Sequence, residues 1–295
     1  MGPPAFFFPY VIVRPMSELL KVILLSILQG IAEFLPISSS GHLVAAQHFL
    51  GFSTPGVSLE LALHAGTLVS VCLFYFTAIR TLVCNAVSGS RAAWFYMGAI
   101  VLSMIPCGVA YAVLGDWLEE AFENIRFVGP ALMATGLLLL TTRHPTESPR
   151  PSPLQPSTSD LPSSTFSFQF RDAFLMGLGQ MVAMLPGVSR SGTTIWVARL
   201  CRVPPAEAAR FSFLMSVPVI GGACLLDIPD VLSAMEPVSE GATVLPVWML
   251  GIGALISAVV GYASLTLLVR MLNRGRFWFF GVYCLLAGLF LTLFH

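Results

Sequence analysis

The sequence predicts an all-α protein that crosses a membrane several times. Its 295 residues are 56% hydrophobic and only 10% charged, and the mean hydropathy is +0.83. Soluble domains carry roughly 25% charged residues, so this chain has too few charges to cover a surface in water. The 15 basic residues are balanced by 15 acidic ones, and this balance gives no indication of a nucleic-acid partner.

Six uncharged runs are candidates for membrane spans, because a spanning helix needs about 20 mainly apolar residues. They are 61–79, 92–115, 127–142, 211–226, 241–269 and 277–294. Two further apolar stretches, 19–35 and 173–189, end in polar segments that contain proline or glycine. These two resemble half-helices more than full spans. We therefore expect one membrane domain over 1–295, built from six spans and two re-entrant helical hairpins.

The charges of the connecting loops predict the orientation, because arginine-rich loops tend to face the cytoplasm. By this rule the cytoplasmic loops are 80–91, 143–172 and 270–276, and the acidic outer loops are 116–126 and 227–240. Segment 143–172 is rich in proline and serine, and we expect a flexible aqueous loop. Segment 173–209 then begins and ends on the cytoplasmic side, either by two short crossings or by a dip into the membrane.

The parts of the chain on either side of that loop resemble each other. We expect repeat one over about 16–142 and repeat two over about 173–294. "FVGPALMATGLLLL" (127–140) matches "FFGVYCLLAGLFLT" (279–292), and "FLPISSSGH" pairs with "MLPGVSRSGT" if one residue is inserted. A hairpin plus three spans in each half would invert the second copy, giving an inverted-topology repeat. Irregular backbone at membrane depth must be buried in protein or line a wet cavity, so the two polar motifs are predicted to meet in one pocket.

The first polar motif, "QGIAEFLPISSSGHL", contains the acidic candidate Glu33. Gln29 is four residues before Glu33, so both lie on one helix face, and a carboxylate in an apolar stretch indicates function. The alternative is a glutamate that faces water at a helix end. Pro36 ends this helix, and the following serines can cap a new one that starts near residue 39. Ser39 and His42 are candidates for nucleophile and proton transfer, against the alternative of a capped turn.

The second polar motif, "PGVSRSGTT", places an arginine among small residues just before a helix. Backbone N–H groups, the helix dipole and a guanidinium group all favour a tetrahedral oxyanion. Arg190 is therefore a candidate phosphate ligand, and the hydroxyl residues beside it are Ser189, Ser191, Thr193 and Thr194. The alternative is an arginine that reaches to the membrane interface. Outside both motifs, His64 follows Glu60 by four residues at the start of a span, and we expect an interfacial or structural role for it.

With these two motifs the sequence resembles the bacterial undecaprenyl-diphosphate phosphatase family of the bacitracin-resistance type. The first motif is similar to the family's (E/Q)xxxE element with its Ser/Gly/His run, and the second to its other signature. The resemblance covers most of 16–294. It implies hydrolysis of undecaprenyl diphosphate to the monophosphate, which recycles the lipid carrier of cell-wall synthesis. It also implies the cytoplasmic membrane, a site open to its outer side, six spans with two re-entrant hairpins and, by analogy alone, a homodimer.

The resemblance further implies roles for individual residues. Gln29 and Glu33 belong to an acid–base and metal element that uses a divalent cation, commonly Mg²⁺ or Ca²⁺. Ser39 and His42 are the candidates for nucleophile and proton transfer. Ser189, Arg190 and Thr194 match phosphate-binding residues, and we count Ser191 with them. Gln29 leaves one carboxylate where the family pattern also permits two, and this bears on metal dependence.

Three mechanisms stay open at this point: His42 attacks phosphorus, His42 activates Ser39, or Glu33 activates water. A type-2 phosphatidic acid phosphatase needs a lysine seven residues before an Arg-Pro pair and a histidine six residues after the motif arginine. Lys21 leads to Leu28 and Arg190 to Trp196, so that class is excluded. The rival from another class is a transporter for the lipid phosphate, because inverted repeats with broken helices are common in transporters.

Overall fold

The computed structural model describes residues 17–52, 58–143, 168–226 and 245–294, and its regular elements there are all helical. The helices are α1 (Glu18–Ala32), α2 (Ser39–Leu50), α3 (Ser58–Phe74), α4 (Phe76–Val87), α5 (Arg91–Glu123), η1 (Ile125–Phe127), α6 (Val128–Leu140), η2 (Thr141–Arg143), α7 (Phe170–Val182), α8 (Arg190–Leu200), α9 (Pro205–Leu226), α11 (Val247–Asn273) and α12 (Phe279–Phe294). The all-α prediction is confirmed. Most of the predicted loop 143–172 and all of 227–240 lie outside the described residues.

Several helices in the described part of the chain can span a membrane. Four segments are long and apolar enough: Arg91–Leu118, Ile125–Arg143, Pro205–Leu226 and Val247–Asn273. The bent pair α3–α4 would make a fifth, and Phe279–Phe294 is apolar but shorter. The chain is therefore a multi-pass membrane protein, as its composition predicts.

Two predicted boundaries are wrong. The run 61–79 is not one straight span, because α3 ends at Phe74 and α4 continues after Tyr75 at an angle of 72°. No proline or glycine marks this break. Instead, the ring of Tyr75 is buried against Phe74 and Phe213, so tertiary packing holds the bend. Most of the predicted loop 80–91 is consequently helical.

The predicted outer loop 116–126 is also mostly helical, because α5 continues to Glu123. The segment 116–123 is acidic but contains neither proline nor glycine. Charge alone does not end a helix, and the helix stops where Asn124 takes an extended conformation and its side chain accepts from the backbone N–H of Arg126.

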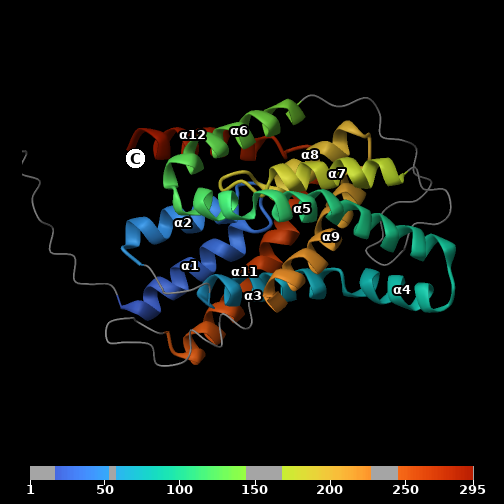
Figure 1. Cartoon of the computed structure of the whole chain (residues 1–295), viewed down its shortest axis with the longest axis horizontal. Helices are drawn as coiled ribbons and strands as arrows, with labels where there is room; N and C mark the ends of the chain where they lie inside the picture. The colour runs from blue at the N-terminus through green and yellow to red at the C-terminus, as the bar shows by residue number, and fades with distance from the viewer. Residues whose placement is uncertain (1–16, 53–57, 144–167, 227–244, 295) are drawn as a thin grey trace, which may run out of the picture.

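The two halves of the chain pack on each other through helix pairs. Helix α1 packs on α11, α5 on α7 and α6 on α12 (Figure 1). The α6–α12 contact is very close: a Cβ on Gly136 would lie 2.8 Å from the carbonyl oxygen of Gly281, and the reverse distance is also 2.8 Å. Gly129 and Gly288 meet in the same reciprocal way. Small residues let two helices in a membrane approach this closely.

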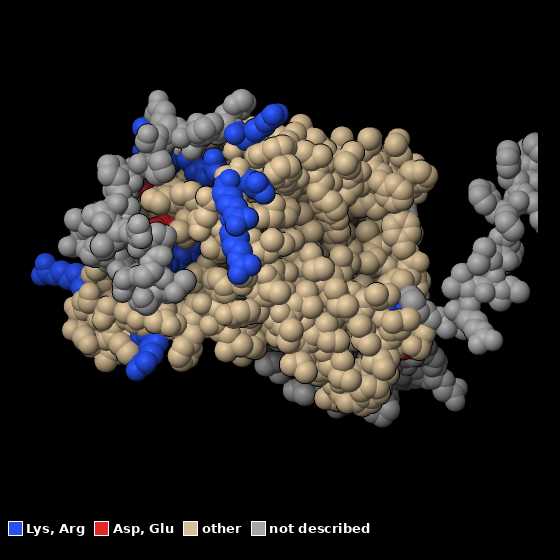
Figure 2. Space-filling model, turned by 180° about the vertical axis from the view of Figure 1, so that it is seen from behind, with Lys and Arg blue, Asp and Glu red and all other residues tan. Residues whose placement is uncertain are grey.

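The surface between the ends of the helices is apolar. Figure 2 shows that basic side chains on the rear face gather mainly toward one end, while a broad area carries no charge. On α5, Val101, Ile105, Val109 and Val113 follow each other at four-residue spacing and are all exposed. Such a continuous exposed apolar stripe is unfavourable in water and suits contact with lipid.

Helix α9 lies at the centre of the packed core. Its first half is almost completely buried, including Phe211, Phe213 and Met215. Phe213 meets Phe34 edge to face at 5.7 Å between ring centroids, so the end of α1 is fixed against the middle of α9. This contact positions the first polar motif.

Candidate active site

The first polar motif forms a sharp break between α1 and α2. Glu33 follows the last residue of α1, and its backbone N–H still donates to the carbonyl of Gln29. Pro36 lies within the break, and α2 begins at Ser39 after Ser38, whose hydroxyl accepts from the N–H of Gly41 at 3.3 Å. The helix end at the proline and the serine cap near residue 39 are both as predicted.

The second polar motif repeats this arrangement between α7 and α8. Ser189 caps α8, its hydroxyl accepting from the N–H of Gly192 at 3.1 Å, and Arg190 is the first residue of the helix. Gly187 has φ +94°, and a Cβ there would lie 2.7 Å from the carbonyl oxygen of Val128. Only glycine fits this turn, because another residue would meet both backbone strain and a clash.

Glu33 is the point at which the two motifs meet. Its Oε1 accepts a hydrogen bond from Nη2 of Arg190, and the two side chains form an ion pair. Its Oε2 accepts from the hydroxyl of Ser39 at 2.7 Å and from the side-chain amide of Gln29 at 3.0 Å. The Glu33 side chain is only 4% exposed, so it needs these partners to remain charged.

His64 completes the surroundings of this carboxylate, and sequence reasoning missed it. Its Nε2 lies 3.7 Å from Oε2 of Glu33, and its Nδ1 lies 2.7 Å from the backbone oxygen of Glu60. The expectation of a merely interfacial or structural role is therefore too narrow. The four-residue spacing of Glu60 and His64 was the available signal, but it did not reveal that α3 begins beside Glu33.

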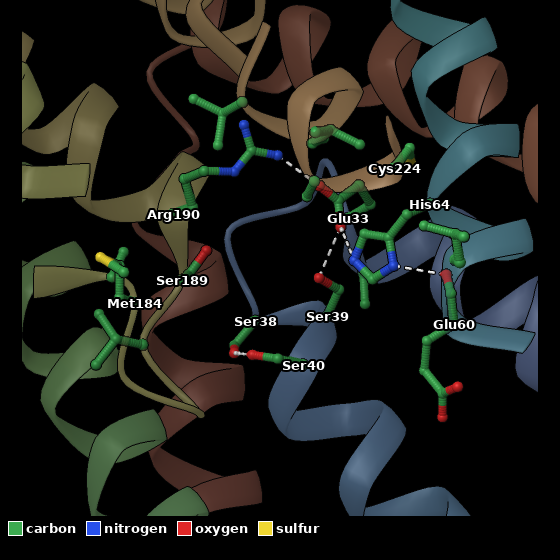
Figure 3. A pocket seen from close by; sticks show the side chains of 17 residues that line it. Glu33, Ser38, Ser39, Ser40, Glu60, His64, Met184, Ser189, Arg190 and Cys224 are labelled. Atoms are coloured by element: carbon green, nitrogen blue, oxygen red, sulfur yellow. Dashed lines mark hydrogen bonds and ion pairs between the residues drawn. The ribbon is translucent and has the colours of Figure 1, made fainter. Parts of the chain in front are cut away.

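A cavity of about 380 Å³ opens between the two breaks, the start of α3 and the second half of α9. Figure 3 shows Arg190 and Ser39 approaching Glu33 from different helices, with His64 beside them. Polar lining residues include Glu33, Ser39, Glu60, His64, Ser189 and Arg190. The rest of the lining is mainly apolar and includes Leu61, Val219, Ile220 and Ala223. The cavity thus combines charged side chains with apolar ones, as an amphipathic ligand would require.

Comparison with known proteins identifies the family of the chain. The family model described as "Bacitracin resistance protein BacA" matches residues 22–290. The chain belongs to the BacA family. A protein of Halothermothrix orenii named undecaprenyl-diphosphatase is 33% identical over 94% of this chain and 98% of its own length. Proteins with the same name are 35% identical in Salinibacter ruber, over 91% of this chain and 96% of the relative, and 36% identical in Desulfosudis oleivorans, over 92% and 96%.

In this BacA-family chain, four predicted site residues do not line the cavity. Gln29 is fully buried, and its side-chain amide donates to Glu33. His42 points instead toward α12, where its Nε2 lies 2.8 Å from the hydroxyl of Tyr283. Thr194 is fully buried, and its hydroxyl meets the carbonyl of Arg190 and the hydroxyl of Ser212. Ser191 is buried and meets Ser189. These are corrections to the expected pocket: helix periodicity turns residues 191 and 194 toward the protein interior, while residue 190 faces the cavity.

The residues expected to hold a cation were Gln29 and Glu33. Oε1 of Gln29 is buried without a hydrogen-bond partner, and so is Oε2 of Glu60. Within the described ranges, no group of three or more His, Cys, Asp and Glu side chains could hold a metal ion. Mg²⁺ is often held by one or two carboxylates together with substrate phosphates. The BacA-family site therefore fits a cation that is shared with a phosphate ligand and not a cage of protein ligands alone.

Proposed function

We propose that the chain hydrolyses undecaprenyl diphosphate to undecaprenyl phosphate and inorganic phosphate. The observation that carries the proposal is the meeting of Ser39, Glu33 and Arg190, from two distant motifs, in one cavity whose remaining lining is mainly apolar. The family and the names of its relatives agree with it. They give no support to a lipid transporter. By removing the diphosphate, this activity recycles the carrier lipid and confers resistance to bacitracin.

Arg190 is the proposed phosphate ligand. It is the first residue of α8, where the helix dipole and free N–H groups also attract an anion. A bound phosphate competes with Glu33 for the guanidinium group, because both are anions that pair with it. Arg190 then moves its hydrogen bonds to the phosphate oxygens and stabilises the charge that develops during transfer.

Ser39 is the proposed nucleophile, and Glu33 is the proposed base. The Ser39 hydroxyl already donates to Glu33 at 2.7 Å, which is the direction of proton transfer that activation requires. The oxygen of Ser39 forms a bond to the terminal phosphorus, its proton passes to Glu33, and the bond from phosphorus to the bridging oxygen breaks. The lipid monophosphate leaves. Glu33 gives its proton to the leaving lipid monophosphate and is again a carboxylate. Water then attacks the phosphoserine and its proton passes to Glu33. As the bond between phosphorus and the Ser39 oxygen breaks, Glu33 returns this proton to Ser39 and inorganic phosphate leaves.

A divalent cation is proposed to assist at the same site in the cavity. Glu33 and the unpartnered Oε1 of Gln29 would hold it, and it would neutralise oxygens of the diphosphate when bound. Glu60 also lines the cavity, but its carboxylate accepts from the side-chain amide of Gln47 and points away from Glu33 (Figure 3).

The two halves are further proposed to form an inverted-topology repeat with two re-entrant hairpins. Each half begins with a short helix, a polar break and a second short helix, α1–α2 and α7–α8. The reciprocal approach of Gly136 to Gly281 and of Gly129 to Gly288 is the contact that a pseudo-two-fold axis would produce. The same axis would exchange the helix pair α1–α11 with the pair α7–α5, and the helices of both pairs are in contact.

We place this domain in the cytoplasmic membrane with the cavity open to the outer side. The cavity is lined by the start of α3 and by the last turns of α9. Helix α9 leads into the acidic segment 227–240, which the charge rule places outside.

The proposal predicts that purified protein in detergent releases phosphate from undecaprenyl diphosphate, and that Arg190→Ala lowers kcat/KM by about 10³-fold or more. Phosphate release is measured with and without a chelator. If a cation takes part, the chelator should abolish phosphate release. Arg126→Ala is the matched control, since Arg126 lies in η1 outside the cavity lining. An inactive wild type, or full activity in Arg190→Ala, would contradict the proposed function.

A further inference from the structure

His42 has both ring nitrogens engaged away from the cavity. Its Nδ1 lies 2.8 Å from the backbone oxygen of Ser38, and its Nε2 lies 2.8 Å from the hydroxyl of Tyr283. A carbonyl oxygen only accepts, so Nδ1 carries the proton and, in the neutral ring, Nε2 accepts from the tyrosine O–H. The two rings are also stacked, with centroids 5.7 Å apart and an interplanar angle of 16°. No ring nitrogen is left to exchange a proton with a phosphate in the cavity.

Ser39 does not depend on His42 for a base. Its hydroxyl donates to Glu33, and His42 is not among the residues that line the cavity. A contribution of His42 to the reaction therefore acts through the groups that it contacts, which are the Ser38 carbonyl and the Tyr283 hydroxyl.

The second half of the chain contains an equivalent of one His42 contact, the hydrogen bond to the carbonyl of the helix cap. Thr193 stands four residues after the helix cap Ser189, as His42 stands four residues after the cap Ser38. The Thr193 hydroxyl donates to the backbone oxygen of Ser189 at 2.7 Å. A threonine hydroxyl is no proton-transfer group at neutral pH. The feature common to both positions is a side-chain hydrogen bond to the carbonyl of the cap residue.

The Ser38 carbonyl has a particular need to be held. Ser38 has φ +68° and ψ 100°, a conformation that residues other than glycine rarely adopt. The same carbonyl also accepts from the backbone N–H of His42 at 3.2 Å. Because the peptide group that joins Ser38 to Ser39 carries this oxygen, its orientation sets the direction in which the Ser39 hydroxyl points.

We propose that His42 and Tyr283 form a positioning pair that holds the Ser38–Ser39 peptide so that Ser39 faces Glu33 and the phosphate. Tyr283 belongs to α12, so the last helix of the chain supports a nucleophile near its start. This inference rests on the proposed function. It assigns Tyr283 a role in the reaction and gives His42 a positioning role in place of proton transfer or attack.

The decisive experiment compares His42→Thr with His42→Ala in phosphate release from undecaprenyl diphosphate. Threonine can restore the bond to the Ser38 carbonyl, as Thr193 does in the second half, but it cannot transfer a proton. We expect His42→Thr to keep kcat within about tenfold of wild type and His42→Ala to lose about 100-fold or more, both with little change in KM. The pH profile of kcat/KM should keep its shape in His42→Thr.

Tyr283→Phe is the second variant, because it removes only the hydroxyl and keeps the stacked ring. The loss of one hydrogen bond predicts a kcat about threefold to tenfold lower and no further loss in the His42→Thr background. Tyr262→Phe is the matched control, since that tyrosine lies on α11 and packs on Phe74, away from the cavity lining. It should leave kcat unchanged.

Equal inactivity of folded His42→Thr and His42→Ala, or a limb of the pH profile that disappears in His42→Thr, would overturn the inference while the wild type remains active. Should His42→Thr elute as an aggregate in size exclusion, Tyr283→Phe decides: unchanged kcat refutes the pair and a lowered kcat supports it. A wild type without phosphate release would instead refute the proposed function, and this inference with it.

Discussion

Glu33 joins groups that are far apart in the sequence. Its two oxygens engage Arg190 on one side and Ser39 with Gln29 on the other. This pairing keeps a nearly buried carboxylate charged, and it also explains how the site could respond to substrate. When a phosphate takes over Arg190, Glu33 loses its strongest partner and becomes a better base for Ser39.

At this scale we predict that Glu33→Gln lowers kcat by about 10²–10⁴-fold, because the amide cannot accept the Ser39 proton. Ser39→Ala should lose a comparable amount or more and should form no acid-stable phosphoserine with substrate labelled in its terminal phosphate. Ser88→Ala is the control, since Ser88 is exposed and bonds only its own helix. A labelled adduct that persists in Ser39→Ala would show that another residue attacks.

The two short helices α2 and α8 share one design. Each is capped by a serine, and each presents its first residue, Ser39 or Arg190, to the cavity. The cap and the break before it fix where the helix starts, and the start fixes which side chain faces the phosphate. A small shift of either helix would therefore change the catalytic geometry without touching a catalytic group.

We predict that Gly187→Ala acts in this way. It combines strain at φ +94° with a Cβ that would lie 2.7 Å from the Val128 carbonyl oxygen, and it should cost about 1–3 kcal/mol of stability. It should also lower kcat, because α8 and Arg190 must move. Gly89→Ala shares a positive φ of 80° but has open space around it, so it should lower the Tm without lowering kcat. Equal effects of both variants on kcat would argue against displacement of α8.

The whole molecule is held together by contacts between its halves. The pairs α1–α11, α5–α7 and α6–α12 each join one half to the other. The outer surface of the molecule is broadly apolar and suits contact with lipid. Neither half could form the cavity alone, because Ser39 and Glu33 come from the first half and Arg190 from the second. The orientation in the membrane then decides from which side substrate reaches the site.

We predict that the start of α11 lies outside and its end inside. In a variant without the six native cysteines, Val247→Cys should react with a membrane-impermeant maleimide in intact spheroplasts. Asn273→Cys should react only after the membrane is permeabilised. Both residues are exposed in the structure, so accessibility of the side chain is matched. The reverse pattern would place the cavity on the cytoplasmic side.

The sequence alone was enough to predict the membrane class and the local backbone features. The scarcity of charge predicted a helical membrane protein, Pro36 predicted the break after α1, and the serines that follow it predicted where α2 starts. These features depend on residues a few positions apart, whose preferences act on the backbone directly. The two motifs were also correctly expected to share one pocket.

Contacts between residues far apart in the sequence could not be predicted from local patterns. The bend at Tyr75 arises from packing against α9, and no local residue signals it. His64 reaches Glu33 while the more prominent His42 turns to Tyr283, because each side chain follows the direction of its own helix and the neighbour that helix meets. Residue types and spacing restrict which groups can carry the chemistry, but the packing of the helices determines which of them face the same cavity.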